Sequence, residues 1–213
     1  MAGAIMRAEA DVLEKKIVEA VQNNVDKKDQ DDAKALGVVN HLLDADAGVI
    51  NMPQQQLDEI IFKASPVVKI TIFNQAQSFR QQNWKREEDR VKLTRVIPIF
   101  KALIASDTED KYHRNHGQLG YTLKDKIDPD YKTAESELSK AMEIRDKSGK
   151  KGRWLLYEFN RAFCRISVNA IENKEVYPKA AIYADIQAAS QVSSIQELIS
   201  KLDLFGEWLK NNA

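Results

Sequence analysis

The segment that decides the fold is Tyr112–Arg145, which reads YHRNHGQLGYTLKDKIDPDYKTAESELSKAMEIR. Apolar and small residues recur in it at the three- and four-residue spacing of amphipathic helices, and a polar stretch, Asp125–Asp130, separates two such patterns. Gly120 stands in the first pattern, and Ala134 and Ala141 stand seven residues apart in the second. Because glycine has no side chain and alanine has a single methyl group, two antiparallel helices can approach closely where these residues cross. The segment therefore predicts a tightly packed helical hairpin.

The order of these residues, with Leu119 before Gly120 in the first helix and Tyr131, Ala134, Leu138 and Ala141 in the second, resembles the tetratricopeptide repeat (TPR), a helix-turn-helix unit of about 34 residues. A fainter unit follows from Trp154 to Ala188, and an earlier one, residues 66–105, fits by length and by the spacing of Ala102 to Ala141. The resemblance implies an all-α fold, in which TPR-like antiparallel helical hairpins form a short right-handed solenoid. The alternative is an irregular helical domain with small residues at its helix crossings.

The chain before the repeats is expected to form separate helices. A first helix with Ile5, Leu13, Ile17 and Val21 on one face should stop near Asn23-Asn24, and a second should run from Asp29–Asp32 to Leu43. A short helix around Leu57–Ile61 should follow. We therefore divide the chain into an N-terminal helical segment, residues 1–64, and a TPR-like repeat domain with a capping helix, residues 65–213.

In residues 65–213, prolines and capping residues predict where further helices begin and end. Ser65-Pro66 has the form of an N-cap followed by a first-position proline and starts a helix to about Gln82. Its β-branched residues make a buried strand the competing interpretation. The next helix should run from Trp84 to Ile104 with a kink at Pro98, and another should start at Asp107–Asp110. Ile195–Asn211 should form a single C-terminal capping helix.

Composition limits the class of protein. The 213 residues carry 32 basic and 32 acidic side chains, so a strongly basic polyanion binder is not expected. The single cysteine, Cys164, cannot form an internal disulfide, and no apolar run approaches the roughly 20 residues that span a bilayer. Without a signal-peptide pattern at the N-terminus, a cytoplasmic location away from membranes is expected.

Signatures of catalysis are weak. Neither glycine-rich phosphate-binding motif occurs, and Gly149–Gly152 lacks the preceding strand that a phosphate loop needs. Asp110, His113 and His116 stand three residues apart and offer a metal-dependent hydrolase as a remote alternative, although zinc sites normally need a third or fourth ligand in matched geometry and no H-E-x-x-H motif occurs. Cys164 is expected to be buried and inert. We expect no enzyme activity, no cofactor and no bound metal.

The TPR resemblance implies that the first helices of the units line a concave binding surface. The positions around the helix crossings that would then contact a protein or peptide partner are Arg80, Asn83, Arg114, Tyr121, Lys124, Asp125, Glu158 and Arg165. Arginine binds carboxylates with two hydrogen bonds, which favours an acidic partner. The expected function is that of a non-enzymatic adaptor or assembly scaffold.

The charges are unevenly distributed along the chain. Residues 1–53 carry 6 basic and 10 acidic side chains, whereas residues 54–104 carry 9 basic and 5 acidic ones. The basic segment 80–101, with Trp84 as an aromatic that could stack on a base, supports a nucleic-acid-associated helical protein as the alternative function. The N-terminal helices are candidates for a homodimer contact, with Ile5, Leu13, Ile17 and Val21 buried in a second copy.

Overall fold

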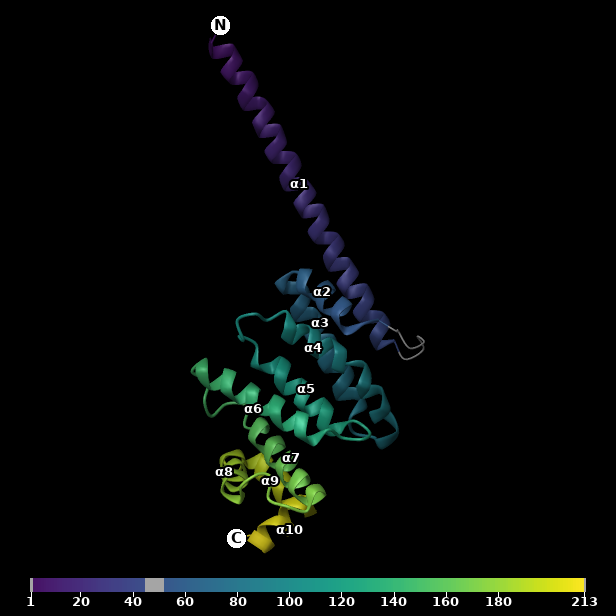
Figure 1. Ribbon diagram of the computed structural model, residues 1–213, viewed down its shortest axis with the longest axis vertical. Coiled ribbons are helices and arrows are strands. Elements are labelled where there is room, and N and C mark those ends of the chain that lie inside the picture. Colours follow the sequence, from purple (N-terminus) through teal and green to yellow (C-terminus); the bar gives the residue numbers. More distant parts are fainter. Residues whose placement is uncertain (1, 45–51, 213) are drawn as a thin grey trace.

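The protein is all-helical, as predicted, and no β-strand occurs in residues 2–44 and 52–212, the part that the computed structural model describes. In chain order the helices are α1 (Ala2–Leu43), α2 (Gln54–Lys63), α3 (Pro66–Asn83), the 3-10 helix η1 (Glu87–Arg95), α4 (Ile97–Ala105), α5 (His113–Asp125), α6 (Tyr131–Lys147), α7 (Leu156–Glu172), α8 (Lys179–Ala189), α9 (Ser193–Lys201) and α10 (Asp203–Asn212). Figure 1 shows α2 to α10 stacked along the long axis in roughly their chain order, with α1 projecting from one end.

Helices α5 and α6 form the predicted hairpin and lie at the centre of the stack (Figure 1). A Cβ atom on Gly120 would lie 2.8 Å from Leu138 Cγ and 3.1 Å from the carbonyl oxygen of Ala134, so the two backbones are in close contact at this point. Ala134, Leu138 and Ala141 are fully buried. The side chain of Asp130 caps α6 by accepting a hydrogen bond of 3.0 Å from the Thr133 amide. The sequence-based reading of this hairpin is confirmed.

The described apolar residues form two cores, and α7 contributes to both. Tyr157 and Cys164 of α7 belong to the larger core, which α1 to α6 build, whereas Phe159 and Ile166 face the smaller core with α8, α9 and α10. Phe205 of α10 is fully buried and stacks on Phe159 with 5.3 Å between ring centroids. The C-terminal helices therefore close the end of the stack, while α7 joins it to the centre.

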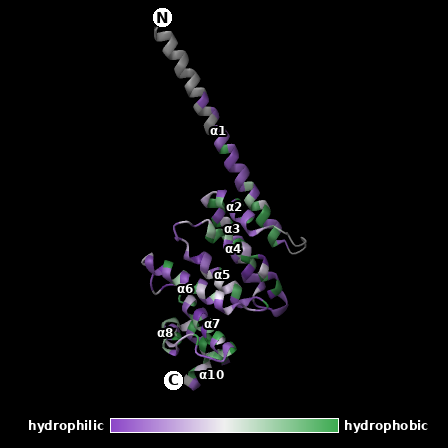
Figure 2. Ribbon diagram, viewed as in Figure 1, coloured by the Kyte–Doolittle hydropathy of each residue, from purple (hydrophilic) through white to green (hydrophobic). Residues whose placement is uncertain are grey.

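Helix α1 is one continuous helix, and the prediction of a stop near Asn23-Asn24 is wrong. The residues between the two predicted helices are polar but include neither proline nor glycine, and polarity alone does not end a helix. Residues 22–30 are exposed, whereas Ala35 and Val39 are fully buried in the larger core. In the part of α1 that Figure 2 colours, hydrophobic residues gather at the end that meets the body of the protein. The Ile5, Leu13, Ile17 and Val21 side chains invoked for a homodimer contact lie outside those described.

The last turns of α1 share the larger core with later helices. Ala35 and Val39 pack in one cluster with Ile61 of α2 and Phe100 of α4. The carboxylate of Asp32 accepts a hydrogen bond of 2.6 Å from the Ser65 amide, and this bond lowers the pKa of Asp32. The division of the chain at residue 64 stays a prediction.

Helix α3 begins where the Ser65-Pro66 pair predicts. The hydroxyl oxygen of Ser65 accepts a hydrogen bond of 3.3 Å from the Val68 amide, and Pro66 occupies the first turn, where its missing N–H is not needed. The helix rather than the competing strand forms because Ile72 and Ala76 keep helical spacing and are both fully buried.

Three predicted boundaries are corrected by the structure. The single helix expected from Trp84 to Ile104 is divided into η1 and α4, and Pro98 lies in the first turn of α4 instead of kinking a longer helix. Helix α5 starts at His113 rather than at Asp107–Asp110, because the Asp107 carboxylate instead accepts a 2.7 Å hydrogen bond from the Tyr112 amide and holds a loop. The expected C-terminal helix is interrupted at Leu202, whose backbone is extended, and becomes α9 and α10.

The contact at Gly120 can be tested by adding one methyl group. We expect Gly120→Ala to lower the free energy of unfolding by about 2 kcal/mol, because the methyl group would overlap Leu138 and the backbone of Ala134. The matched control is Gly37→Ala in α1, where an added Cβ meets no atom within 4 Å. That change should raise stability by up to about 1 kcal/mol through helix propensity. Urea unfolding followed by circular dichroism measures both, and equal effects of the two changes would contradict the close approach.

Candidate functional site

The eight residues expected to bind a partner do not form one open surface. Arg114 is exposed, whereas the other seven are buried or partly buried. The buried ones are Arg80, Asn83, Asp125 and Glu158, and the partly buried ones are Tyr121, Lys124 and Arg165. Most of their polar groups contact other groups of the chain. These contacts form three clusters of charged residues between helices.

The first cluster joins α3 to α5. Arg80 and Lys124 both form ion pairs with the carboxylate of Asp125. The Arg80 guanidinium also lies over the Tyr121 ring, 5.1 Å from its centroid. Asn83 donates a hydrogen bond of 2.7 Å to the Phe79 carbonyl within its own helix. The structure thus brings four of the predicted residues together, around a buried carboxylate.

The second and third clusters join α6 to α7 and α8. Arg145, which is 1 % exposed, donates hydrogen bonds of 2.8 and 3.0 Å to the two carboxylate oxygens of Glu158. Arg165 pairs with Glu135 of α6 at 2.7 Å and with Asp185 of α8 at 3.0 Å. Each of these pairs bridges different helices, so the charges hold neighbouring helices in register.

The Arg145–Glu158 pair should contribute to stability in a way that can be measured. We expect Glu158→Ala to lower the free energy of unfolding by about 3 kcal/mol, because the buried guanidinium then keeps only the partly exposed Asp146 carboxylate and loses its buried one. The control Glu143→Ala removes an exposed carboxylate that pairs with Lys147 on the same helix, and it should change stability little.

A third variant separates the loss of the pair from the loss of packing. The double change Arg145→Met with Glu158→Leu should recover most of the lost stability, since Asp146, which loses its partner, is partly exposed and no buried charge is then left unpaired. Urea unfolding gives all three values, and a Glu158→Ala protein as stable as the unchanged one would overturn this role.

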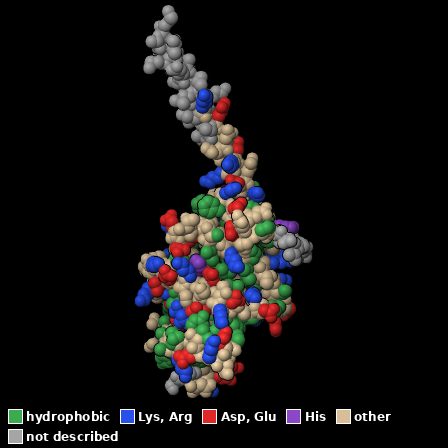
Figure 3. Space-filling view, in the orientation of Figure 1, with side chains coloured by type: hydrophobic (Ala, Val, Ile, Leu, Met, Phe, Trp, Pro, Cys, Tyr) green, Lys and Arg blue, Asp and Glu red, His purple; other side chains and the backbone are tan. Residues whose placement is uncertain are grey.

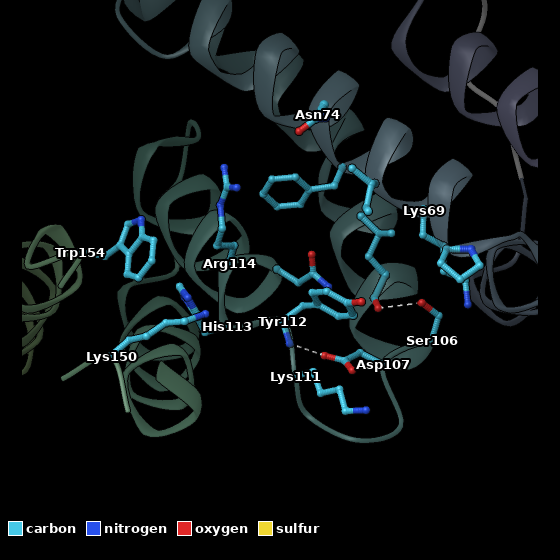
Figure 4. Close-up of a pocket in the computed structure, with 15 residues that line it drawn as sticks. Lys69, Asn74, Ser106, Asp107, Lys111, Tyr112, His113, Arg114, Lys150 and Trp154 are labelled. Atoms are coloured by element: carbon cyan, nitrogen blue, oxygen red, sulfur yellow. Dashed lines mark hydrogen bonds between the residues drawn. The ribbon is translucent and has the colours of Figure 1, made fainter. Parts of the chain in front are cut away.

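An open pocket of about 510 Å³ lies on another part of the molecule, where α3, the end of α4, the start of α5 and the α6–α7 connector meet (Figure 4). We call it the α3–α5 pocket. Its apolar wall includes Pro66, Ile70, Phe73 and Leu103, and the aromatic side chains of Tyr112 and Trp154 also line it. Ile70, Tyr112 and Trp154 are 54 %, 54 % and 44 % exposed, so large apolar groups face the solvent at this pocket.

Cations predominate among the charged residues of the α3–α5 pocket, namely Lys69, Lys111, Arg114 and Lys150 against Asp107. Lys111 is engaged by Glu109 at 2.7 Å. The other three cations have no carboxylate within ion-pair distance among the described residues. They lie instead over aromatic rings: Arg114 over Phe73 at 4.7 Å, Lys69 over Phe62 at 5.4 Å and Lys150 over Trp154 at 5.8 Å. On the face drawn in Figure 3, basic and acidic side chains are intermixed.

His113 lies between the α3–α5 pocket and the larger core. Its Nδ1 atom is 2.9 Å from the Tyr157 hydroxyl, and its ring is 4.8 Å from the Trp154 ring, centroid to centroid. Burial, together with the positive charges of Lys150, Arg114 and Arg145, lowers the pKa of His113 to about 4. The imidazole is therefore neutral near pH 7 and adds no charge to the pocket.

This depressed pKa predicts how stability depends on pH. In the unfolded chain His113 takes up a proton near pH 6.5, whereas in the folded chain it does so only near pH 4, so the folded state loses stability as the pH falls between these values. We expect the free energy of unfolding to fall by about 2 kcal/mol more in the unchanged protein than in His113→Asn between pH 7 and pH 4. Urea unfolding across this range measures the difference, and parallel curves would contradict it.

The residues considered for metal binding and catalysis have other partners. The Asp110 carboxylate pairs with Lys140 at 2.8 Å, and His116 Nδ1 is 2.7 Å from a carboxylate oxygen of Glu137. No group of three or more His, Cys, Asp or Glu residues within the described part of the chain could hold a metal ion. Cys164 is fully buried, as predicted, and burial raises the pKa of its thiol to about 12. A thiol of this kind is not a nucleophile near pH 7.

The basic segment 80–101 does not present a continuous positive surface. Lys92 and Arg86 lie 2.7 and 3.7 Å from the carboxylate of Asp89, and Arg90 donates a hydrogen bond of 2.9 Å to the Trp84 carbonyl. Glu87 and Glu88 add two more negative charges to η1. Trp84 is 37 % exposed, and the Arg80 guanidinium lies 5.9 Å from the centre of its ring.

Sequence reasoning did not single out Lys69, Phe73, Tyr112 or Lys150 as site residues. The only signal for Lys150 was its place between Gly149 and Gly152, which was considered for a phosphate loop and set aside. The others come together only because α3 packs beside the start of α5.

Comparison of the chain with protein-family models, with curated proteins and with solved structures found no match. Among the helices that the structure describes, none is long and apolar enough to cross a membrane.

Proposed function

We propose that the chain is a TPR-like helical-repeat module that binds a protein or peptide partner through the α3–α5 pocket and works as an adaptor or scaffold, without chemistry of its own. The observation that carries this proposal is an open pocket in which exposed apolar groups stand beside three cations that form no ion pair with a carboxylate of the described chain. Such a surface has unsatisfied capacity for both hydrophobic and ionic contacts.

The helical architecture supports the proposal. Helices α5 and α6 pack closely at Gly120, which would make them one TPR-like unit, with α7 and α8 as the next unit and α3 with α4 as an earlier one. In this arrangement rigid helices present side chains from several units to one ligand. A cytoplasmic location fits a chain whose one cysteine is a buried free thiol. Helix α1 remains the candidate for contact with a second copy of the chain.

The alternative of nucleic-acid binding by residues 80–101 has less support. The cations of η1 are already paired with Asp89 or bound to a backbone carbonyl, and their acidic neighbours would repel phosphates. None of the residues 80–101 lines the α3–α5 pocket.

Peptide selection tests the proposed function. We expect a random-peptide display library, selected on the immobilised protein, to yield peptides that Ile70→Gln binds about tenfold more weakly, because this change removes an exposed apolar part of the pocket wall. Val91→Gln is the matched control, since Val91 is 56 % exposed on η1 and is not a pocket residue. Fluorescence anisotropy gives the affinities. Failure to select any peptide, or equal effects of the two substitutions, would refute peptide binding at this pocket.

A further inference from the structure

We propose that the ligand of the α3–α5 pocket is an acidic peptide segment, which places an apolar side chain against Ile70 and Trp154 and sets its carboxylates against Lys69, Arg114 and Lys150. This inference rests on the proposed function and names the chemistry of the partner.

The charge pattern is the first argument. At the helix interfaces the chain supplies carboxylates for buried and partly buried arginines, as in the pairs of Arg80 with Asp125, Arg145 with Glu158 and Arg161 with Asp185. The α3–α5 pocket breaks this pattern. Its one acidic residue, Asp107, accepts a hydrogen bond from the Tyr112 amide. Burial lowers the pKa of Lys69 and the Asp107 charge raises it in part, but the two groups form no ion pair, so the three cations can still bind an outside carboxylate.

The placement of the three cations is the second argument. Lys69 comes from α3, Arg114 from the first turn of α5 and Lys150 from the α6–α7 connector, and Figure 4 shows Lys69 and Lys150 on opposite sides with Arg114 between them. Burial lowers the pKa of Lys69, which means that its ammonium group has lost part of its hydration. Arg114 uses one of its nitrogens to donate to Gln77, and its remaining N–H groups can donate to a carboxylate.

The backbone at Trp154 is the third argument. Its φ angle is +52°, a left-handed conformation that costs a bulky residue on the order of 1 kcal/mol or more and occurs preferentially at ligand contacts. The buried Arg145 holds this conformation, because it donates a hydrogen bond of 2.9 Å to the Arg153 carbonyl. The Arg145 carbonyl in turn accepts a bond of 3.1 Å from the Lys150 amide. The connector is thus fixed with the Trp154 ring and the Lys150 ammonium at the pocket.

The combination of exposed apolar side chains and three cations in one pocket favours an acidic peptide over other anions. A small inorganic anion would leave the exposed surface of Ile70 and Trp154 uncovered, and a nucleic-acid backbone would bring its phosphates close to Asp107. A volume of about 510 Å³ accommodates a few side chains of a segment that crosses the pocket.

The test uses three synthetic peptides of ten residues, each acetylated and amidated. The first has a central Leu-Phe pair flanked by glutamates, the second has glutamine in place of every glutamate, and the third has Ser-Ser in place of Leu-Phe. We expect the first to bind the full-length protein at least tenfold more tightly than either of the others in titration calorimetry at low salt, and the advantage over the glutamine peptide should shrink as salt increases.

Two double variants test whether the preference for the glutamate peptide arises at the α3–α5 pocket. Lys69→Met with Lys150→Met should abolish the preference for glutamate, whereas Lys85→Met with Lys101→Met removes two exposed lysines outside the pocket and should preserve it. Circular dichroism confirms that each variant is folded.

The outcomes separate the two proposals. Equal affinity for the glutamate and glutamine peptides, or no binding of either while library-selected peptides bind, would overturn the acidic ligand and leave peptide binding intact. Tighter binding of a single-stranded oligonucleotide that is lost in Lys69→Met with Lys150→Met would replace the peptide by a nucleic acid. If no peptide of any kind binds, the proposed function fails as well.

Discussion

The structure depends on the approach of two backbones at Gly120. Because this residue has no side chain, Leu138 and the carbonyl of Ala134 fill the space where a Cβ atom would stand, and α5 and α6 pack as one unit. A second glycine of α5, Gly117, lies so close to the ring of Tyr157 that an added Cβ would overlap it. The two glycines on one helix thus let α6 and α7 both pack directly on α5, and the remaining helices are arranged around this centre.

Small residues let the helices pack closely, and buried charge pairs fix their positions relative to one another. Hydrophobic contacts alone permit helices to slide, since they have little directional preference. Buried pairs such as Arg145 with Glu158 are directional, and each allows only a narrow range of positions for the helices that it joins. The same pair fixes the α6–α7 connector through the Arg153 carbonyl, so the packing of the core and the shape of the α3–α5 pocket depend on a common interaction.

Several elements were predictable because their signals are local. The Ser65-Pro66 pair marks the start of α3, and the hairpin of α5 and α6 follows from apolar spacing and small residues within one short segment. The errors also have local causes. The polar run after Asn23 suggests a helix end, but it contains no residue that breaks a helix. Pro98 suggests a kink, but proline is also favoured in the first turn of a helix, which is where it lies.

The sequence by itself determined that the chain is helical, where most helices lie and which hairpin is central, because helical spacing, caps and small residues act over a few turns. Only the tertiary structure decided which charges meet. Arg80 and Asp125 are 45 residues apart, and their pairing depends on how α3 packs against α5. For the same reason Lys69, Arg114 and Lys150 share a pocket, while other cations of equal prominence in the sequence lie between helices with carboxylates beside them. The sequence gives the charge of each side chain, but the packing of distant segments determines which groups lie beside it.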